Sequence, residues 1–235
     1  MMKLTVEKRF DDRAELAKSL ARKVASLLQE AIDTRGKASL VVSGGRTPLA
    51  FFQALSRQPI SWSKVLVTLA DERWVDADDP ASNEALVRQN LMQGWAASAR
   101  FVGLKTPHAT VEAGLELATD WLGALPTPLD VVILGMGNDG HTASLFPDCP
   151  NLKQGLETGD VLIAAHPASQ PLPRISMSLS TLLNSRQIYL HLEGKDKADT
   201  LAKALAGNDV TAMPIRAVLG QKQTPVDVYL YQEEA

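Results

Sequence analysis

Two side chains suited to acid-base chemistry lie in a glycine-rich segment, residues 135–147, which reads GMGNDGHTASLFP. An imidazole has an unperturbed pKa of about 6.5, so His141 can take up a proton and return it near neutral pH. Asp139 can orient or charge-stabilise that imidazole, as the acid of a catalytic triad does. A lone histidine is usually structural, but this one ends an Asp-Gly-His sequence in a glycine-rich turn that follows a strand-like run, DVVIL. The segment therefore predicts a catalytic pair.

The glycines of this segment also match the G-x-G-x-x-G pattern of a dinucleotide-binding turn. Such a turn needs a long helix from its last glycine and an acidic residue about 20 positions further on, at the end of a second strand. Pro147 cuts the helix short, and Asp160 precedes the next strand-like run. We interpret the glycines, Gly137 among them, as a turn that lets Asp139 and His141 reach into a cleft.

A second glycine segment, VVSGGRTP at residues 41–48, has the pattern of an anion cradle. Two adjacent glycines, Gly44 and Gly45, let the backbone approach a ligand, while Thr47 and Pro48 are typical of an N-cap and a first helical residue. Free N–H groups at a positive helix end favour a phosphate. The alternative is an ordinary strand-to-helix turn, and the Gly-Lys-Ser/Thr end of a Walker A loop is missing. Further donors for a phosphate are the side chains of Ser43, Arg46 and Thr47.

Charged residues elsewhere in the chain are weaker candidates for the site. Asp71 and Glu72 stand beside Arg73 at the end of a strand-like run, where a solvated charge cluster is the alternative. Arg174 is an isolated cation, and Lys197 opens a predicted helix, where a cation opposes the helix dipole and hints at another role.

The other histidines give no metal pattern. His108, His166 and His191 lie in separate segments without His-x-x-x-His spacing, so we predict no protein-bound catalytic metal. His191 in a strand and His166 before a proline are interpreted as packing or loop residues.

Apolar runs of strand length alternate with segments of helical periodicity. In the helix predicted over residues 11–36, apolar side chains recur at helical spacing, Asp11 or Asp12 can cap the start, and Gly36 can end it. The alternation predicts a doubly wound, Rossmann-like α/β fold, a mainly parallel sheet with helices on both faces. Ligands bind beyond the carboxyl ends of such strands. The predicted strands are residues 4–10, 38–42, 65–70, 130–134, 161–165, 187–192 and 226–231, and residues 148–160 are predicted to be mainly loop.

The bulk composition is that of an ordinary globular domain. Of 235 residues, 45% are hydrophobic and 22% charged, and the net charge of −3 would not attract nucleic acid or an anionic membrane. No run approaches the roughly 18 apolar residues of a membrane helix, and MMKLTVEKRF lacks the apolar region of a secretory signal. We expect one α/β domain over residues 1–235, located in the cytoplasm. Cys149, the sole cysteine, cannot form an internal disulfide.

Five motifs in order, SGGRTP, DERWV, GMGNDGHTASLFP, PRISMSLSTL and GKDKA, resemble the 6-phosphogluconolactonase family. Glucosamine-6-phosphate deaminases share related elements but follow Asp-Gly-His with a Phe-Asn-Glu-Pro type of sequence. Here residues 144–147 read SLFP, so that glutamate is absent, and Asp-Glu-Arg replaces the deaminases' Asp-Glu-Tyr. Both differences favour the lactonases.

The resemblance implies a sugar-phosphate isomerase/deaminase-type fold and hydrolysis of 6-phospho-D-glucono-1,5-lactone to 6-phospho-D-gluconate, a step of the oxidative pentose phosphate route. It implies a small-molecule sugar-phosphate substrate, no cofactor, and a monomer or small homo-oligomer. The alternatives are a deaminase/isomerase-like enzyme and a non-catalytic sugar-phosphate-binding domain. The substrate-binding residues that the resemblance implies are Ser43, Gly44, Gly45, Thr47, Arg73, Arg174 and Lys197. The residue patterns described above add Arg46, Asp71 and Gly137.

Overall fold

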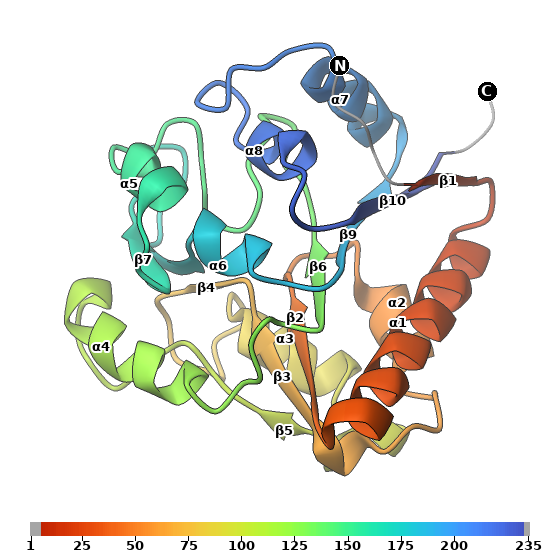
Figure 1. Ribbon diagram of the computed structural model, residues 1–235. Coiled ribbons are helices and arrows are strands. Elements are labelled where there is room, and N and C mark those ends of the chain that lie inside the picture. Colours follow the sequence, from red (N-terminus) through yellow and green to blue (C-terminus); the bar gives the residue numbers. More distant parts are fainter. Residues whose placement is uncertain (1–5, 233–235) are drawn as a thin grey trace.

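A parallel sheet of seven strands forms the centre of the protein in the computed structural model, which describes residues 6–232 (Figure 1). All six neighbouring strand pairs are parallel, as predicted for the doubly wound class. The strands, in spatial order, are β1 (Val6–Phe10), β10 (Val226–Tyr231), β9 (Ile188–Glu193), β6 (Val131–Leu134), β2 (Ala38–Val42), β3 (Val65–Leu69) and β5 (Arg100–Phe101).

The central strands are continuous apolar runs because both of their faces are covered. Every residue of β2 and β6 is buried. The register leaves the carboxyl ends uneven, since Leu134 at the end of β6 pairs with Leu190, and β9 continues to Glu193. This uneven edge is where the site lies.

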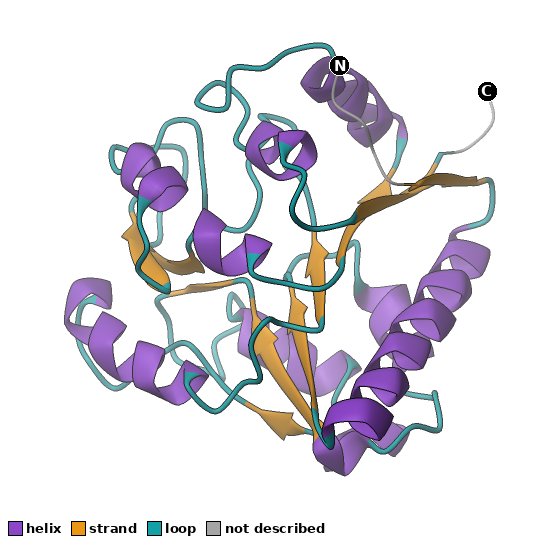
Figure 2. Ribbon diagram, viewed as in Figure 1, coloured by secondary structure: helices purple, strands orange, loops and turns teal. Residues whose placement is uncertain are grey.

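Helices cover both faces of the sheet (Figure 2). The longest is α1 (Arg13–Arg35). As predicted, Asp12 caps its start, with a side chain that accepts a hydrogen bond from the Ala14 N–H, and Gly36 caps its end in a left-handed conformation. The other helices are α2 (Leu49–Leu55), α3 (Asn83–Asn90), α4 (Val111–Leu122), α5 (Leu152–Glu157), α6 (Leu179–Leu183), α7 (Lys195–Leu205) and α8 (Ile215–Gly220), with 3₁₀ turns at Trp62–Lys64 and Gly94–Ser98.

A separate antiparallel sheet corrects one expectation. The run at residues 161–165 does not join the main sheet. It forms β7 (Leu162–Ala165), which pairs with β8 (Arg174–Met177), and β8 in turn pairs with β4 (Asp71–Arg73). Periodicity predicts a strand but not its partner, because pairing is a long-range choice. This small sheet has a direct consequence for the site, since it places Arg73 opposite Arg174.

Two local predictions are wrong. Helix α2 begins at Leu49, and Pro48 occupies the cap position without a side-chain capping bond, so Thr47 lies outside the helix and does not cap it. Residues 148–160 contain the short helix α5 rather than a continuous loop. Helices of one or two turns owe their stability to tertiary packing, so the local sequence signals them poorly.

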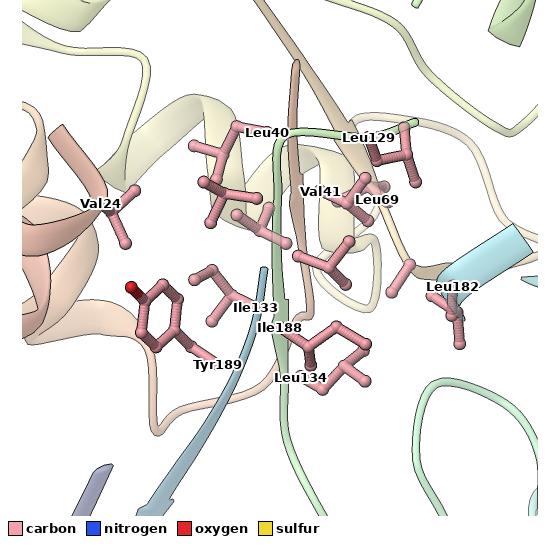
Figure 3. Close-up of a cluster of buried hydrophobic side chains, with 14 of the residues drawn as sticks. Val24, Leu40, Val41, Leu69, Leu129, Ile133, Leu134, Leu182, Ile188 and Tyr189 are labelled. Carbon is pink, nitrogen blue, oxygen red and sulfur yellow. The ribbon is translucent and has the colours of Figure 1, made fainter. Parts of the chain in front are cut away.

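The core holds the strand ends in place. Figure 3 shows buried side chains of the central strands with Val24 of α1 on one side and Leu182 of α6 on the other. Fully burying one aliphatic side chain contributes about 1.5–3 kcal/mol. The loops at the carboxyl edge therefore start from rigid positions. Within residues 6–232, no helix is long and apolar enough to span a membrane.

Candidate active site

A cavity of about 270 Å³ opens at the carboxyl ends of β2, β6 and β9. The turn after β2, the turn after β6 and the β9–α7 turn form most of its wall, and the small sheet closes one side. Its position agrees with the expectation that ligands bind beyond the strand ends.

The imidazole of His141 lines this cavity, and Asp139 holds it from behind. Oδ1 of Asp139 lies 2.6 Å from Nδ1 of His141 and accepts a second bond, of 3.1 Å, from the His141 backbone N–H. Burial raises the pKa of Asp139, but the hydrogen bond and charge of His141 outweigh it, and the net pKa lies below the ordinary value. The carboxylate is thus charged at neutral pH and can accept a hydrogen bond from a proton on Nδ1, an arrangement in which Nε2 is the ring nitrogen that can accept a proton.

Phe146 fixes the plane of the imidazole. The two rings stack with centroids 3.9 Å apart and planes 24° from parallel, and Phe146 is only 2% exposed. The guanidinium of Arg174 lies 5.1 Å from the centre of the same phenyl ring. The SLFP sequence that distinguishes this chain from the deaminases therefore supplies a packing surface for the catalytic candidate.

Gly137 approaches the pair so closely that no side chain fits. A Cβ at this position would collide with the His141 ring and with Oδ1 of Asp139. The turn closes through the Gly137 N–H, which donates to the His141 carbonyl at 2.9 Å, and through Gly140 with a φ of 81°. The glycines allow close approach and a left-handed turn, and no long helix follows them. The turn brings His141 to the cavity, as interpreted from the sequence, but not Asp139.

Arg174 and Asp71 form the wall on the side of the small sheet. Both are buried, and NH1 of Arg174 lies 3.7 Å from Oδ2 of Asp71, which also accepts a 2.5 Å bond from the Ser144 hydroxyl. Burial, followed by the charge of Arg73, lowers the pKa of Arg174 against the opposing effect of Asp71. NH2 of Arg174 donates to Gln170, whereas its Nε has no hydrogen-bond partner among the described residues. Arg174 thus contributes a buried positive charge to the cavity wall.

Arg73 is held by a buried carboxylate that sequence reasoning did not assign. Glu72 is 1% exposed and accepts bonds from the backbone N–H groups of Arg73, Asn83 and Glu84, two of which open α3. NH1 of Arg73 then donates to the Asn83 side chain at 2.8 Å. Asn83 itself lines the cavity and fills the space where Gly44 would carry a Cβ. In the sequence, the only sign that Asn83 belongs to the site is its position directly after Ser82, the residue that caps α3.

The turn after β2 faces the cavity as an anion cradle would. Gly45 has a φ of 92°, and among the described residues no acceptor takes a bond from the backbone N–H of Gly44 or Gly45. Ser43 donates its hydroxyl to the Ile133 carbonyl at 3.1 Å, which ties the turn to β6. Thr47 lines the cavity, but Arg46 is exposed and does not.

Lys197 joins the cavity from the first turn of α7. Its Nζ donates to Oδ1 of Asn138 at 2.6 Å, so it bridges to the loop that carries the catalytic candidate. Burial lowers the pKa of Lys197, and the nearby charges of Asp139 and Asp196 oppose that effect.

The structure brings most of the sequence-predicted residues together around one cavity. Arg46 and Asp139 do not line it, the first because it is exposed and the second because it stands behind His141. His191 is a packing residue, as interpreted, but it also lines the cavity, as do Asn83 and Glu193. Within the described ranges, no three His, Cys, Asp or Glu residues gather in a way that could hold a metal ion.

Comparison with known proteins identifies the class. Residues 11–226 match the model of a family described as glucosamine-6-phosphate isomerases/6-phosphogluconolactonase. The chain belongs to this family of enzymes, as the five motifs indicated.

Within the family, the chain groups with the 6-phosphogluconolactonases. One from Rhizobium meliloti (strain 1021) is 44% identical over 224 residues, which cover 94% of this chain and 96% of that one. A crystal structure of a 6-phosphogluconolactonase from Shewanella baltica OS155 is 55% identical, with a TM-score of 0.96 and 99% of both chains covered. A monomeric glucosamine-6-phosphate deaminase shares the fold alone, with a TM-score of 0.81 at 22% identity and 98% of both chains covered.

Proposed function

We propose that this chain hydrolyses 6-phospho-D-glucono-1,5-lactone to 6-phospho-D-gluconate, with His141 as the general base. The observation that carries the mechanism is the 2.6 Å contact between Asp139 and Nδ1 of an imidazole that lines the cavity. The names of the similar relatives support the substrate, and the absence of the deaminase glutamate from residues 144–147 supports hydrolysis over deamination.

One imidazole can serve both halves of the reaction. Nε2 of His141 takes a proton from water as the water oxygen bonds to the lactone carbonyl carbon. The tetrahedral intermediate then collapses, the bond from that carbon to the ring oxygen breaks, and the imidazolium returns the proton to the departing oxygen. Asp139 stabilises the imidazolium between these steps, and the stacked Phe146 keeps the ring in plane.

Two groups are candidates for stabilising the oxyanion of the intermediate. The buried Arg174, which has an unpartnered Nε, can place a positive charge there, and the backbone N–H groups of the turn after β6 can donate hydrogen bonds. The phosphate is assigned to the turn after β2 together with Lys197, because unbonded N–H groups and a half-buried cation converge there. A remote phosphate positions the reacting carbonyl through binding energy spent away from it.

The experiment follows acid release from freshly prepared lactone by wild type and His141→Ala, with spontaneous hydrolysis subtracted. Loss of the base is expected to lower kcat about 10²- to 10⁴-fold. His108→Ala, which removes an exposed imidazole outside the cavity, is the matched control and should retain wild-type kcat. Equal rates for wild type and His141→Ala would eliminate His141 as the base. Ammonia release from glucosamine 6-phosphate would favour the deaminase alternative.

A further inference from the structure

The side chain of Asn83 joins two segments of the cavity wall and has no part in the reaction above. It is buried, with 2% of its surface exposed. Its Oδ1 accepts a hydrogen bond from NH1 of Arg73 at 2.8 Å, and its Nδ2 donates to the Asp71 carbonyl at 2.9 Å. A Cβ on Gly44 would lie 1.8 Å from the same Oδ1, so the amide also packs against the glycine turn after β2. One buried amide therefore connects β4 to that turn.

The guanidinium of Arg73 is held at one nitrogen only. NH1 donates to Asn83 and to the Ala81 carbonyl, the latter at 2.7 Å. Nε and NH2 have no hydrogen-bond partner among the described residues, and both keep accessible surface. Because Arg73 is half-buried and lines the cavity, these two nitrogens are donors that a bound anion can reach.

No carboxylate neutralises Arg73 within residues 6–232, where it forms no ion pair. The adjacent Glu72 carboxylate instead accepts the backbone N–H groups of Arg73 and Asn83, each at 2.7 Å. A second cation, Arg174, stands opposite Arg73 on β8, and burial, followed by the charge of Arg73, lowers the pKa of Arg174. Like charges directly opposite on neighbouring strands are destabilising. An anion bound beside the two cations would offset this repulsion.

Asparagine suits position 83 because it holds a cation without neutralising it. An amide oxygen accepts a hydrogen bond from a guanidinium but carries no net charge. An aspartate would form an ion pair with Arg73 and place a negative charge beside Gly44, at the turn to which the phosphate is assigned. With Asn83 as the partner, the charge of Arg73 is left for the ligand.

We propose, building on the function proposed above, that Asn83 is a positioning residue for the phosphate of the substrate. Its amide holds Arg73 beside the glycine turn, so that Nε and NH2 of Arg73 and the unbonded N–H groups of Gly44 and Gly45 bind the same phosphate. Asn83 acts through these groups, because each of its own polar atoms already bonds the protein. Glu72 fixes the backbones of Arg73 and Asn83 before the ligand arrives, so little ordering is left to oppose binding.

A double-mutant cycle on ligand affinity tests whether Asn83 acts through Arg73. Calorimetry measures binding of 6-phosphogluconate to wild type, Asn83→Ala, Arg73→Ala and the double variant. Each single variant should bind about tenfold or more weakly, because a hydrogen bond to a charged group is misaligned or lost. In the Arg73→Ala background, Asn83→Ala should weaken binding by at most about a further twofold, since the group that it positions is gone.

Asn90→Ala is the matched control and should bind like wild type. Asn90 belongs to the same helix, but its Nδ2 donates to the Leu86 carbonyl and it does not line the cavity. A role in folding alone would leave affinity unchanged or weaken it by the same factor with and without Arg73, and either result would overturn the proposal. A folded wild type that does not bind 6-phosphogluconate would overturn it as well.

Circular dichroism shows whether each variant is folded. If Asn83→Ala is not, Asn83→Ser takes its place in the cycle with the same expected result, because the hydroxyl is polar but too short to hold Arg73. Binding is measured without turnover, so the two proposals fail separately. A protein that shows the coupling but hydrolyses no lactone contradicts only the proposed function, whereas one that hydrolyses the lactone with independent losses contradicts only the role of Asn83.

Discussion

At the level of single residues, the proposed chemistry depends on how three side chains hold one another in place. Asp139 lies within hydrogen-bond distance of Nδ1 of His141, and the buried Phe146 stacks on the ring. Burial raises the pKa of Asp139, but the hydrogen bond and charge of His141 bring it below the ordinary value, so the carboxylate stays charged and holds the ring in its orientation.

Asp139→Asn should lower kcat by up to about 10⁴-fold, because an amide cannot hold the proton on Nδ1 and stabilise the imidazolium. Steady-state kcat of wild type and variant measures the loss, with circular dichroism to show that the variant is folded. A folded variant with unchanged kcat would remove Asp139 from the mechanism.

Gly137→Ala should lower kcat because the added methyl displaces the His141 ring and the Asp139 carboxylate. A loss of about 100-fold is expected from a displacement of about 1 Å. Gly159→Ala is the matched control, since a Cβ there meets nothing within 4 Å. Steady-state rates of the two variants, each checked for folding by circular dichroism, decide the point. Wild-type activity in Gly137→Ala would show that the turn tolerates a side chain.

At the scale of elements, the site depends on how β4 meets α3. The carboxylate of Glu72 accepts both backbone bonds at the start of α3 and a 3.0 Å bond from the Ser82 hydroxyl. This junction positions Asn83, whose side chain accepts a hydrogen bond from Arg73 and occupies the space next to Gly44. The buried carboxylate of Glu72 therefore connects the glycine turn after β2 to the small sheet.

Glu72→Gln should lower the free energy of unfolding by about 1–3 kcal/mol, because the amide nitrogen faces donors instead of accepting from them. Burial raises the pKa of Glu72 above its ordinary value, although its hydrogen bonds oppose this. The folded state then binds the proton more readily than the unfolded state. The stability contributed by Glu72 therefore grows as pH falls from the raised pKa of the folded state to the lower pKa of the unfolded state. Urea unfolding of both proteins at two pH values measures the difference, and a pH-independent difference would contradict the assignment.

At the scale of the whole molecule, the two sheets share one hydrophobic core. Leu162, Ile175 and Met177 of the small sheet belong to the same buried cluster as Leu40 and Ile133 of the main sheet. A shared core couples the two sheets energetically, and we propose that the chain unfolds as a single α/β unit.

Unfolding in urea should therefore give one transition, with coincident midpoints by far-ultraviolet circular dichroism and by tryptophan fluorescence. The fully buried Trp62 reports the packing next to the main sheet. Hydrogen exchange at amides of β2 and β7 should show the same opening free energy near the transition. Separate midpoints, or early exchange of β7, would show that the small sheet unfolds independently.

The sequence alone determined what local physics controls. Continuous apolar runs predicted six of the seven strands of the main sheet, with β5 missed, and helical spacing with Asp12 and Gly36 predicted α1. The Asp-Gly-His sequence after a strand indicated that Asp139 could orient His141. Each of these features depends on residues that are near one another in the chain, so the signal is present in a short window.

Tertiary structure decided which distant segments meet. The pairing of β4 with β8 put Arg73 opposite Arg174, and the extension of β9 beyond β6 brought His191 to the cavity, so that a strand histidine that packs in the core also lines the cavity. No local pattern encodes these choices, because strand partners and register depend on the burial of side chains far apart in sequence. The sequence thus indicated the candidate catalytic pair, while the fold assembled the charged cavity around His141.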